Sequence, residues 1–285
     1  MNLTSQLISR LRRRTRFRTP VISGVSARKK EDIPMEPKRV VIPDDEFDGA
    51  AIKTALQVLA ELANDDKNVR ECALLIPVKG NLQHTTLSAV LGESATKTLD
   101  GGKFVRLGQC SLRLETERSF NNHTKADAVL AVYADQRMMD SVDSNGNFKI
   151  VICVPHMPEA VEEWVRTWNP IMPGQQQTDA ILVENPVVEA ALESITGRIN
   201  LGSRILNPRD KETVKDAFRI LRAHNEVEDP KNIRAWCIKN GWDSKGADEA
   251  MRHAAKAFNL KSKPSRYGQH WADNILTQWM DKADK

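Results

Sequence analysis

Charged side chains follow several of the apolar segments that the sequence predicts to be strands. Asp44 and Asp45 come after the first segment, Lys79 follows the second, Asp135 the third and His156 the fourth. Because the carboxyl ends of parallel strands meet at one edge of an open sheet, these five side chains are expected to line one crevice. Carboxylate, imidazole and ammonium groups in one crevice would suit acid–base chemistry or a nucleotide site.

A simpler interpretation applies to each of these residues. Acids such as Asp44, Asp45 and Asp48 are common in the first turn of a helix, where they cap backbone N–H groups and interact with the helix dipole. No glycine-rich phosphate-binding motif follows any predicted strand. The four cysteines and six histidines are too scattered for a zinc or redox motif, so no metal and no cofactor is expected. No catalytic residue is assigned.

The charge of +4 is divided unevenly along the chain. Residues 1–30 contain nine lysines and arginines and no acid, residues 31–206 carry a net charge of −9, and residues 207–285 carry +4. Arginine side chains match the geometry of phosphate oxygens, and such contacts make binding salt-dependent. The N-terminal arm is therefore predicted to bind nucleic acid through Arg10, Arg12, Arg13, Arg14, Arg16 and Arg18.

Other partners fit the same arm. An acidic protein, an anionic membrane surface or the chain's own acidic middle would attract it as well. An arginine-rich, acid-free N-terminus is also typical of a mitochondrial transit peptide. We expect a cytoplasmic protein, with the mitochondrial matrix as the alternative, and no transmembrane segment, because no apolar run reaches the length of a membrane span.

The C-terminal region offers a second basic surface. Residues 231–240 and 245–258 have helical spacing and are separated by a turn that contains Gly241. These lengths are those of a helix-turn-helix, and they place Lys245, Arg252 and Lys256 outward on the second helix. A helical bundle with a solvated basic face is the simpler alternative.

The elements that must position these residues follow from the apolar pattern. Strands are predicted at residues 39–42, 73–78, 128–133, 149–154 and 180–183, and they alternate with helices beginning near Asp48 and at residues 84–91, 136–142 and 159–168. Residues 96–117 interrupt this alternation with Gly101, Gly102 and Gly108, which favour two hairpin-like strands. Four helices are predicted after residue 202, at 212–224, 231–240, 245–258 and 270–281.

Strands that alternate with helices predict a Rossmann-like α/β fold with a mostly parallel sheet flanked by helices. The expected organisation is a basic arm and linker (1–38), an α/β domain (39–203) and a small all-α domain (204–285). The leading functional hypothesis is a non-catalytic binding subunit of a larger assembly that contacts nucleic acid through both basic ends. The alternatives are a nucleotide-binding enzyme or sensor that uses the strand-end crevice, and an interaction protein whose arm docks on an acidic partner.

Overall fold

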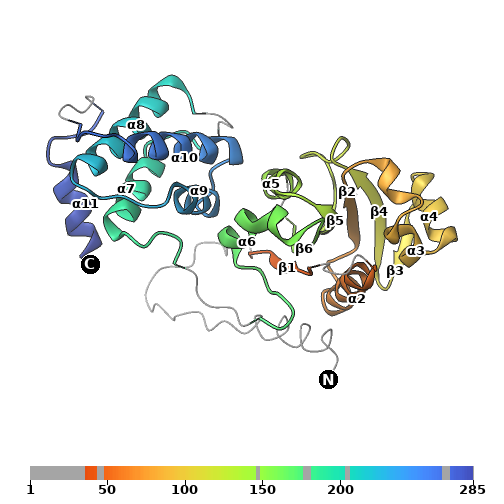
Figure 1. Cartoon of the computed structure of the whole chain (residues 1–285). Helices are drawn as coiled ribbons and strands as arrows, with labels where there is room; N and C mark the ends of the chain where they lie inside the picture. The colour runs from red at the N-terminus through yellow and green to blue at the C-terminus, as the bar shows by residue number, and fades with distance from the viewer. Residues whose placement is uncertain are drawn as a thin grey trace, which may run out of the picture. The chain divides into compact units, whose positions relative to one another are not determined.

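The computed structural model describes residues 36–43, 48–145, 148–175, 181–202, 206–264 and 270–284. The chain forms two compact units, one of Met1–Val165 with Pro170–Thr178 and one of Arg166–Asn169 with Asp179–Lys285 (Figure 1). The first is an α/β unit with a mostly parallel sheet, and the second is helical. The predicted fold class is therefore confirmed.

Six strands form the sheet in the order β1-β6-β5-β2-β4-β3. Their bounds are Lys38–Val41 for β1, Glu71–Ile76 for β2, Val105–Leu107 for β3, Cys110–Thr116 for β4, Ala128–Ala134 for β5 and Ile150–Pro155 for β6. All neighbouring pairs are parallel except β3 and β4, which form an antiparallel hairpin. The chain continues from β2 toward β4 and from β5 in the opposite direction toward β6, so the topological switch point lies between β2 and β5.

Helices cover both faces of the sheet because its central strands are apolar on both sides. Strands β2, β5 and β6 bury nearly all their residues, as parallel strands packed between two layers do. Helix α2 (Ala50–Asp65) lies on one face and contacts β4, β5 and β6. Helix α5 (Gln136–Asn145) lies on the other face (Figure 1), and its residues Met138 and Met139 are buried.

The helix predicted at residues 159–168 forms as two pieces, η2 (Pro158–Val161) and α6 (Glu162–Trp168). Trp164 is buried, and its Nε1 donates a hydrogen bond to Asp143 Oδ2 of α5 at 3.0 Å. Asp143 Oδ1 also lies 3.7 Å from Nη2 of the buried Arg39 on β1. These contacts join α5 to α6 and to strand β1 of the sheet.

One edge of the sheet is covered by a bridging residue, and the hairpin at the other edge packs against a helix. At β1, Val41 N–H donates to Ile171 O at 3.0 Å and Ile171 N–H donates to Arg39 O at 2.9 Å, so residue 171 covers the edge. At the other edge, the β3–β4 turn contains Gly108 with φ +58°. A Cβ on Gly108 would lie 3.1 Å from Asn64 Oδ1 at the end of α2, so the turn packs closely against that helix.

Two details near the carboxyl edge differ from the sequence prediction. Gly49, with φ +87°, is the N-cap of α2, whereas Asp48 was expected there; Asp48 Oδ1 accepts from Ala50 N–H at 2.8 Å. After β2 come η1 (Lys79–Leu82), α3 (Thr86–Leu91) and an additional helix, α4 (Glu93–Asp100). Gly101 therefore ends α4, donating its N–H to Lys97 O at 3.1 Å, and is not part of a hairpin turn.

Among its described residues from 181 onward, the second unit has five helices: α7 (Pro186–Thr196), α8 (Pro208–Ala223), α9 (Pro230–Lys239), α10 (Ser244–Phe258) and α11 (Ile275–Ala283). The first four begin at side-chain caps, from Asn185, Asn207, Asp229 and Asp243. Proline occupies the first turn in α7, α8 and α9, where its missing N–H costs nothing. Side-chain caps thus set the starts of four of these five helices.

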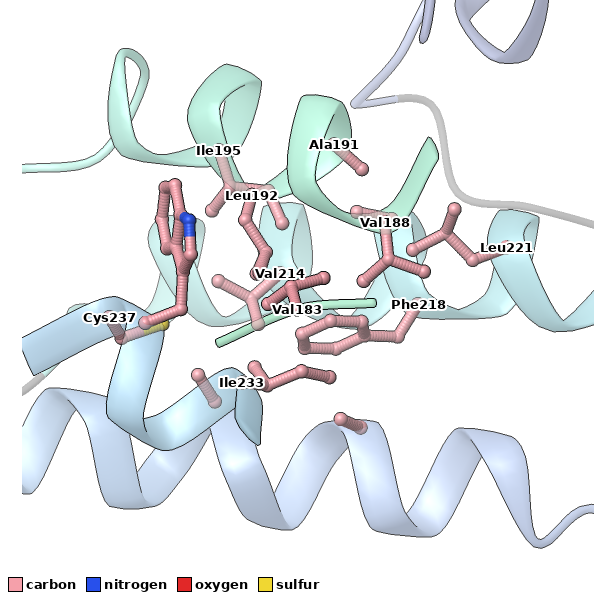
Figure 2. Packing of buried hydrophobic residues seen from close by; sticks show 14 of the residues in the cluster. Val183, Val188, Ala191, Leu192, Ile195, Val214, Phe218, Leu221, Ile233 and Cys237 are labelled. Carbon is pink, nitrogen blue, oxygen red and sulfur yellow. The ribbon is translucent and has the colours of Figure 1, made fainter. Parts of the chain in front are cut away.

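The core of this unit joins α7, α8 and α9. Figure 2 shows Val188 of α7, Phe218 of α8 and Ile233 of α9 pointing toward one another, and all three are fully buried. Val183 packs into the same core, and residues 181–183 form no strand, so the strand predicted at 180–183 is wrong for its described residues. Helix α7 and Val183 belong to this core, and the compact helical unit comprises Arg166–Asn169 with Asp179–Lys285.

Trp279 of helix α11 is one of the residues that join this helix to α7. Trp279 is 1% exposed, and its Nε1 donates to Ser194 Oγ at 3.0 Å. Its ring packs edge-on against Trp271, with centroids 5.3 Å apart. The guanidinium of Arg198 lies 4.2 Å from the centre of the Trp271 ring.

Candidate nucleic-acid interface

Helix α10 has one buried small-residue face and one basic face. Gly246, Ala247, Ala250, Ala254 and Ala257 are buried, so neighbouring helices approach α10 closely. The opposite face carries an exposed row of cations, which we call the α10 stripe: Lys245, Arg252 and Lys256. Its ends are separated by about 16 Å along the helix axis at 1.5 Å per residue.

The cations of the α10 stripe are not neutralised within the described part of the chain. None of the three forms an ion pair with a described carboxylate; Arg252 Nε donates to the backbone oxygen of Asp248 at 3.3 Å. Three of the five cations of neighbouring α8 differ, because they have acidic partners, in the pairs Lys211–Glu249, Lys215–Glu212 and Arg219–Asp216. The α10 stripe is therefore a row of exposed cations that can take an anion without losing an ion pair to a described carboxylate.

Helices α8 and α10 run side by side in the same direction. Lys211 Nζ lies 3.0 Å from Glu249 Oε1 near their starts, and Arg222 Nη2 donates to Leu260 O at 3.0 Å near their ends. His253 lies at this boundary. Burial, and then the positive charge of Lys215, lowers the pKa of His253 below its ordinary value.

The connection from α9 to α10 is a fixed turn. Gly241 has φ +87°, a left-handed conformation that glycine adopts without strain. Trp242 is 5% exposed, and its Nε1 donates to Thr196 Oγ1 of α7 at 2.9 Å. The buried Arg234 of α9 donates from Nε to Asp248 Oδ1 of α10 at 2.6 Å, which holds the two helices in place. The lengths of α9, the turn and α10 are those of a helix-turn-helix.

At the carboxyl edge of the sheet, the side chain of Lys79 is bonded to Asp100 at the end of α4. Its Nζ donates to Asp100 O at 2.8 Å and lies 3.1 Å from Asp100 Oδ1. Lys79 follows β2, the strand next to β5, as the sequence predicts. Its charge, however, is paired at the end of α4.

Asp135 and His156 follow two neighbouring strands, β5 and β6. His156 N–H donates to Ala134 O at 3.0 Å, so the two residues lie at the same strand ends. The Asp135 carboxylate accepts from Met138 N–H at 2.8 Å and thereby caps α5. The structure brings this pair together. The other two predicted residues of the crevice, Asp44 and Asp45, lie outside the described residues, as do the six arginines of the N-terminal arm.

Tyr133, at the switch point, has a left-handed backbone conformation that the sequence does not predict. Tyr133, near the end of β5, has φ +59° and sits in a register irregularity between β5 and β6. Its hydroxyl oxygen accepts a hydrogen bond from Leu87 N–H in the first turn of α3, at 3.1 Å. The first turn of α3 therefore has one of its N–H groups bonded to a side chain of the same unit. Tyrosine offers no sequence signal for a left-handed conformation, because few residues other than glycine, asparagine and aspartate favour it.

The remaining titratable groups supply no further reactive centre within the described residues. Among these residues, no cluster of three or more histidine, cysteine or acidic side chains could hold a metal ion. Burial raises the pKa of the Cys153 and Cys237 thiols, so neither is a thiolate at neutral pH. None of the helices in the described part of the chain combines the length and apolar composition that a membrane span needs.

Comparison with known proteins matches one part of the chain. The model of a family described as a domain of unknown function, DUF1889, matches residues 184–280. No curated protein matches the chain. No solved structure matches it either. The matched residues begin just before α7 and end within α11, so the similarity covers the helical unit and with it the α10 stripe.

Proposed function

We propose that this protein binds nucleic acid through the α10 stripe and acts as a non-catalytic binding subunit of a larger assembly. The observation that carries the proposal is the contrast between two adjacent helices. Three of the five cations of α8 are paired with acids, whereas Lys245, Arg252 and Lys256 of α10 face solvent without a described acidic partner. Exposed cations without carboxylate partners can neutralise phosphates without first breaking an ion pair.

The geometry of α10 suits a phosphate backbone. Its three cations lie along one helix face, and the α9–turn–α10 arrangement resembles the motif that places a helix in the major groove. In that motif, phosphate contacts fix the position of the protein on the duplex. In this proposal the arginines of residues 10–18 supply further phosphate contacts, which raise the affinity and its salt dependence.

The proposal is tested by equilibrium binding of the full chain to fluorescein-labelled 20-base-pair DNA and to single-stranded RNA of equal length. We expect K245Q/R252Q/K256Q to bind the preferred probe about tenfold or more weakly at 0.1 M salt, because three phosphate contacts are lost. The matched control removes three exposed lysines from the α/β unit, in the variant K53Q/K97Q/K125Q.

The control variant is expected to bind like the wild-type chain. An equal loss of affinity in both triple variants would show that binding depends only on the net charge of the protein. An unchanged affinity of K245Q/R252Q/K256Q would remove α10 from the interface. Thermal melting of each variant verifies that the helical unit remains folded.

The strand-end crevice remains the second candidate, favoured by one observation, the adjacency of Asp135 and His156. In that case the protein is a nucleotide-binding enzyme or sensor. The supporting geometry is weaker, because the carboxylate of Asp135 caps α5 and Lys79 is paired with Asp100. Calorimetric titration with nucleoside triphosphates tests it: binding that is lost in His156→Gln and kept in K245Q/R252Q/K256Q would favour the crevice.

A further inference from the structure

A cavity of about 910 Å³ lies at the edge of the sheet opposite the carboxyl ends of the parallel strands. Its walls are the end of α2, the residues that lead into β2, and the β3–β4 hairpin. This volume is within the range of pockets that take small organic ligands. Neither the proposed α10 interface nor the strand-end crevice includes this cavity, so a role for it is independent of the proposed function.

The cavity is lined by three exposed cations from three different segments. Lys67 follows α2, Arg70 precedes β2, and Arg106 lies on β3. Within the described part of the chain none of them forms an ion pair, and Arg70 Nε donates only to the backbone oxygen of Lys67, at 3.5 Å. Glu71 is the single carboxylate in the lining, so the formal charge of the lining is positive.

An exposed aromatic ring lies among these cations. Phe104 lines the cavity and is 53% exposed, although aromatic side chains are usually buried. Asn64 and Gln109 add amide groups to the same lining. A phenyl face beside guanidinium groups and amides is the combination with which proteins stack a nucleobase and hold its phosphate.

The cavity wall is preformed by the packing of the hairpin on α2. Gly108 allows the β3–β4 turn to approach Asn64, and β4 is aligned with β2 from Glu71 opposite Ser111 onward. Arg106 therefore faces the cavity from a strand held at a fixed distance from Arg70. A preformed site loses less entropy on binding than one that must be ordered by its ligand.

We propose that this cavity binds one nucleotide unit, with its base stacked on Phe104 and its phosphate held by Arg70 and Arg106. The unit is supplied either as a free nucleotide or as one residue of a single-stranded nucleic acid, since both present the same base and phosphate. A base inside a duplex is stacked on its neighbours and has no free face for the phenyl ring.

The experiment uses the full chain carrying K245Q/R252Q/K256Q, so that any binding by α10 is removed. Three probes are compared: adenosine triphosphate and inorganic triphosphate by calorimetry, and fluorescein-labelled (dA)12 by anisotropy. Phe104→Ala is expected to weaken binding of the adenine probes about tenfold while leaving inorganic triphosphate unchanged. Phe104→Trp retains the stacking surface and should retain affinity, and R70Q/R106Q should weaken all three probes.

Matched controls are K53Q/K97Q for the lost charges and Val227→Ala for the loss of an exposed apolar side chain. Binding of adenosine triphosphate alone identifies a free nucleotide as the ligand, and binding of (dA)12 alone identifies a single strand. The proposal is overturned if neither adenine probe binds, if Phe104→Ala behaves like Val227→Ala, or if inorganic triphosphate binds as tightly as adenosine triphosphate. Because Phe104 and Arg106 are exposed, their replacement leaves the core intact, which melting curves verify.

Discussion

Replacing Trp279 tests how the helical unit is held together. Its ring is 1% exposed, packs edge-on against Trp271 and donates a hydrogen bond to Ser194 Oγ at 3.0 Å. Truncation of a buried tryptophan to alanine costs about 3–5 kcal/mol, because the lost contacts leave a cavity. For a unit of this size each kcal/mol lowers the melting temperature by about 4–8 °C, so Trp279→Ala should lower it by at least about 12 °C.

Calorimetry of the full chain measures this shift, and two further variants separate its causes. Ser194→Ala leaves the indole N–H without its acceptor and should cost about 1 kcal/mol. Met280→Ala alters the next residue on α11, whose side chain is 45% exposed, and should change stability by no more than about 0.5 kcal/mol. The reasoning is refuted if Trp279→Ala melts like Met280→Ala, or if the loss of stability falls on the α/β unit and not on the helical unit.

The structure predicts the direction in which two other substitutions change stability. Gly108→Ala should destabilise the α/β unit by about 1–2 kcal/mol in urea unfolding, because alanine is strained at φ +58° and its Cβ would crowd Asn64 Oδ1; an unchanged unfolding midpoint would contradict this. Burial and then the charge of Lys215 lower the pKa of His253 in the folded protein. As the pH falls, His253 is therefore protonated in the unfolded chain before it is protonated in the folded one. The stability that neutral His253 contributes is lost as the pH falls from about 6.5 toward the folded pKa. His253→Gln should reduce this acid-side loss when urea unfolding is compared at pH 8 and pH 5.5, and an identical pH dependence in both proteins would exclude the effect.

The sequence predicts the sheet well where burial leaves a simple pattern. Strands β2, β5 and β6 are nearly continuous apolar runs because both their faces are covered. Residues 180–183 form an equally apolar run, yet Val183 enters the helical core without forming a strand. A short apolar run cannot be assigned from periodicity alone. The start of α7 did carry a readable signal, since Asn185 caps it and Pro186 occupies its first turn.

Site residues were harder to predict because their partners come from distant segments. The position of Lys79 after a strand follows from the sequence, but its pairing with Asp100 depends on α4. That helix was not predicted, because the glycines at 101 and 102 were interpreted as part of a hairpin. The cavity at the opposite edge joins Arg70 to Arg106 through the pairing of β2 with β4. The apolar pattern within each segment does not determine which residues of β2 and β4 lie opposite each other. For the α10 stripe, by contrast, helical spacing alone places all three cations on one face.

The central claim is that three cations of α10 contact phosphates, and the salt dependence of binding tests it most directly. Each phosphate contact with duplex DNA contributes about 0.9 to the slope of log K against log salt, so K245Q/R252Q/K256Q should be shallower than the wild-type chain by about 2.7. Between 50 and 200 mM salt, this difference alone changes the ratio of the two affinities about 40-fold. Parallel lines for wild-type chain and variant would contradict the assignment of α10 as the phosphate-binding surface.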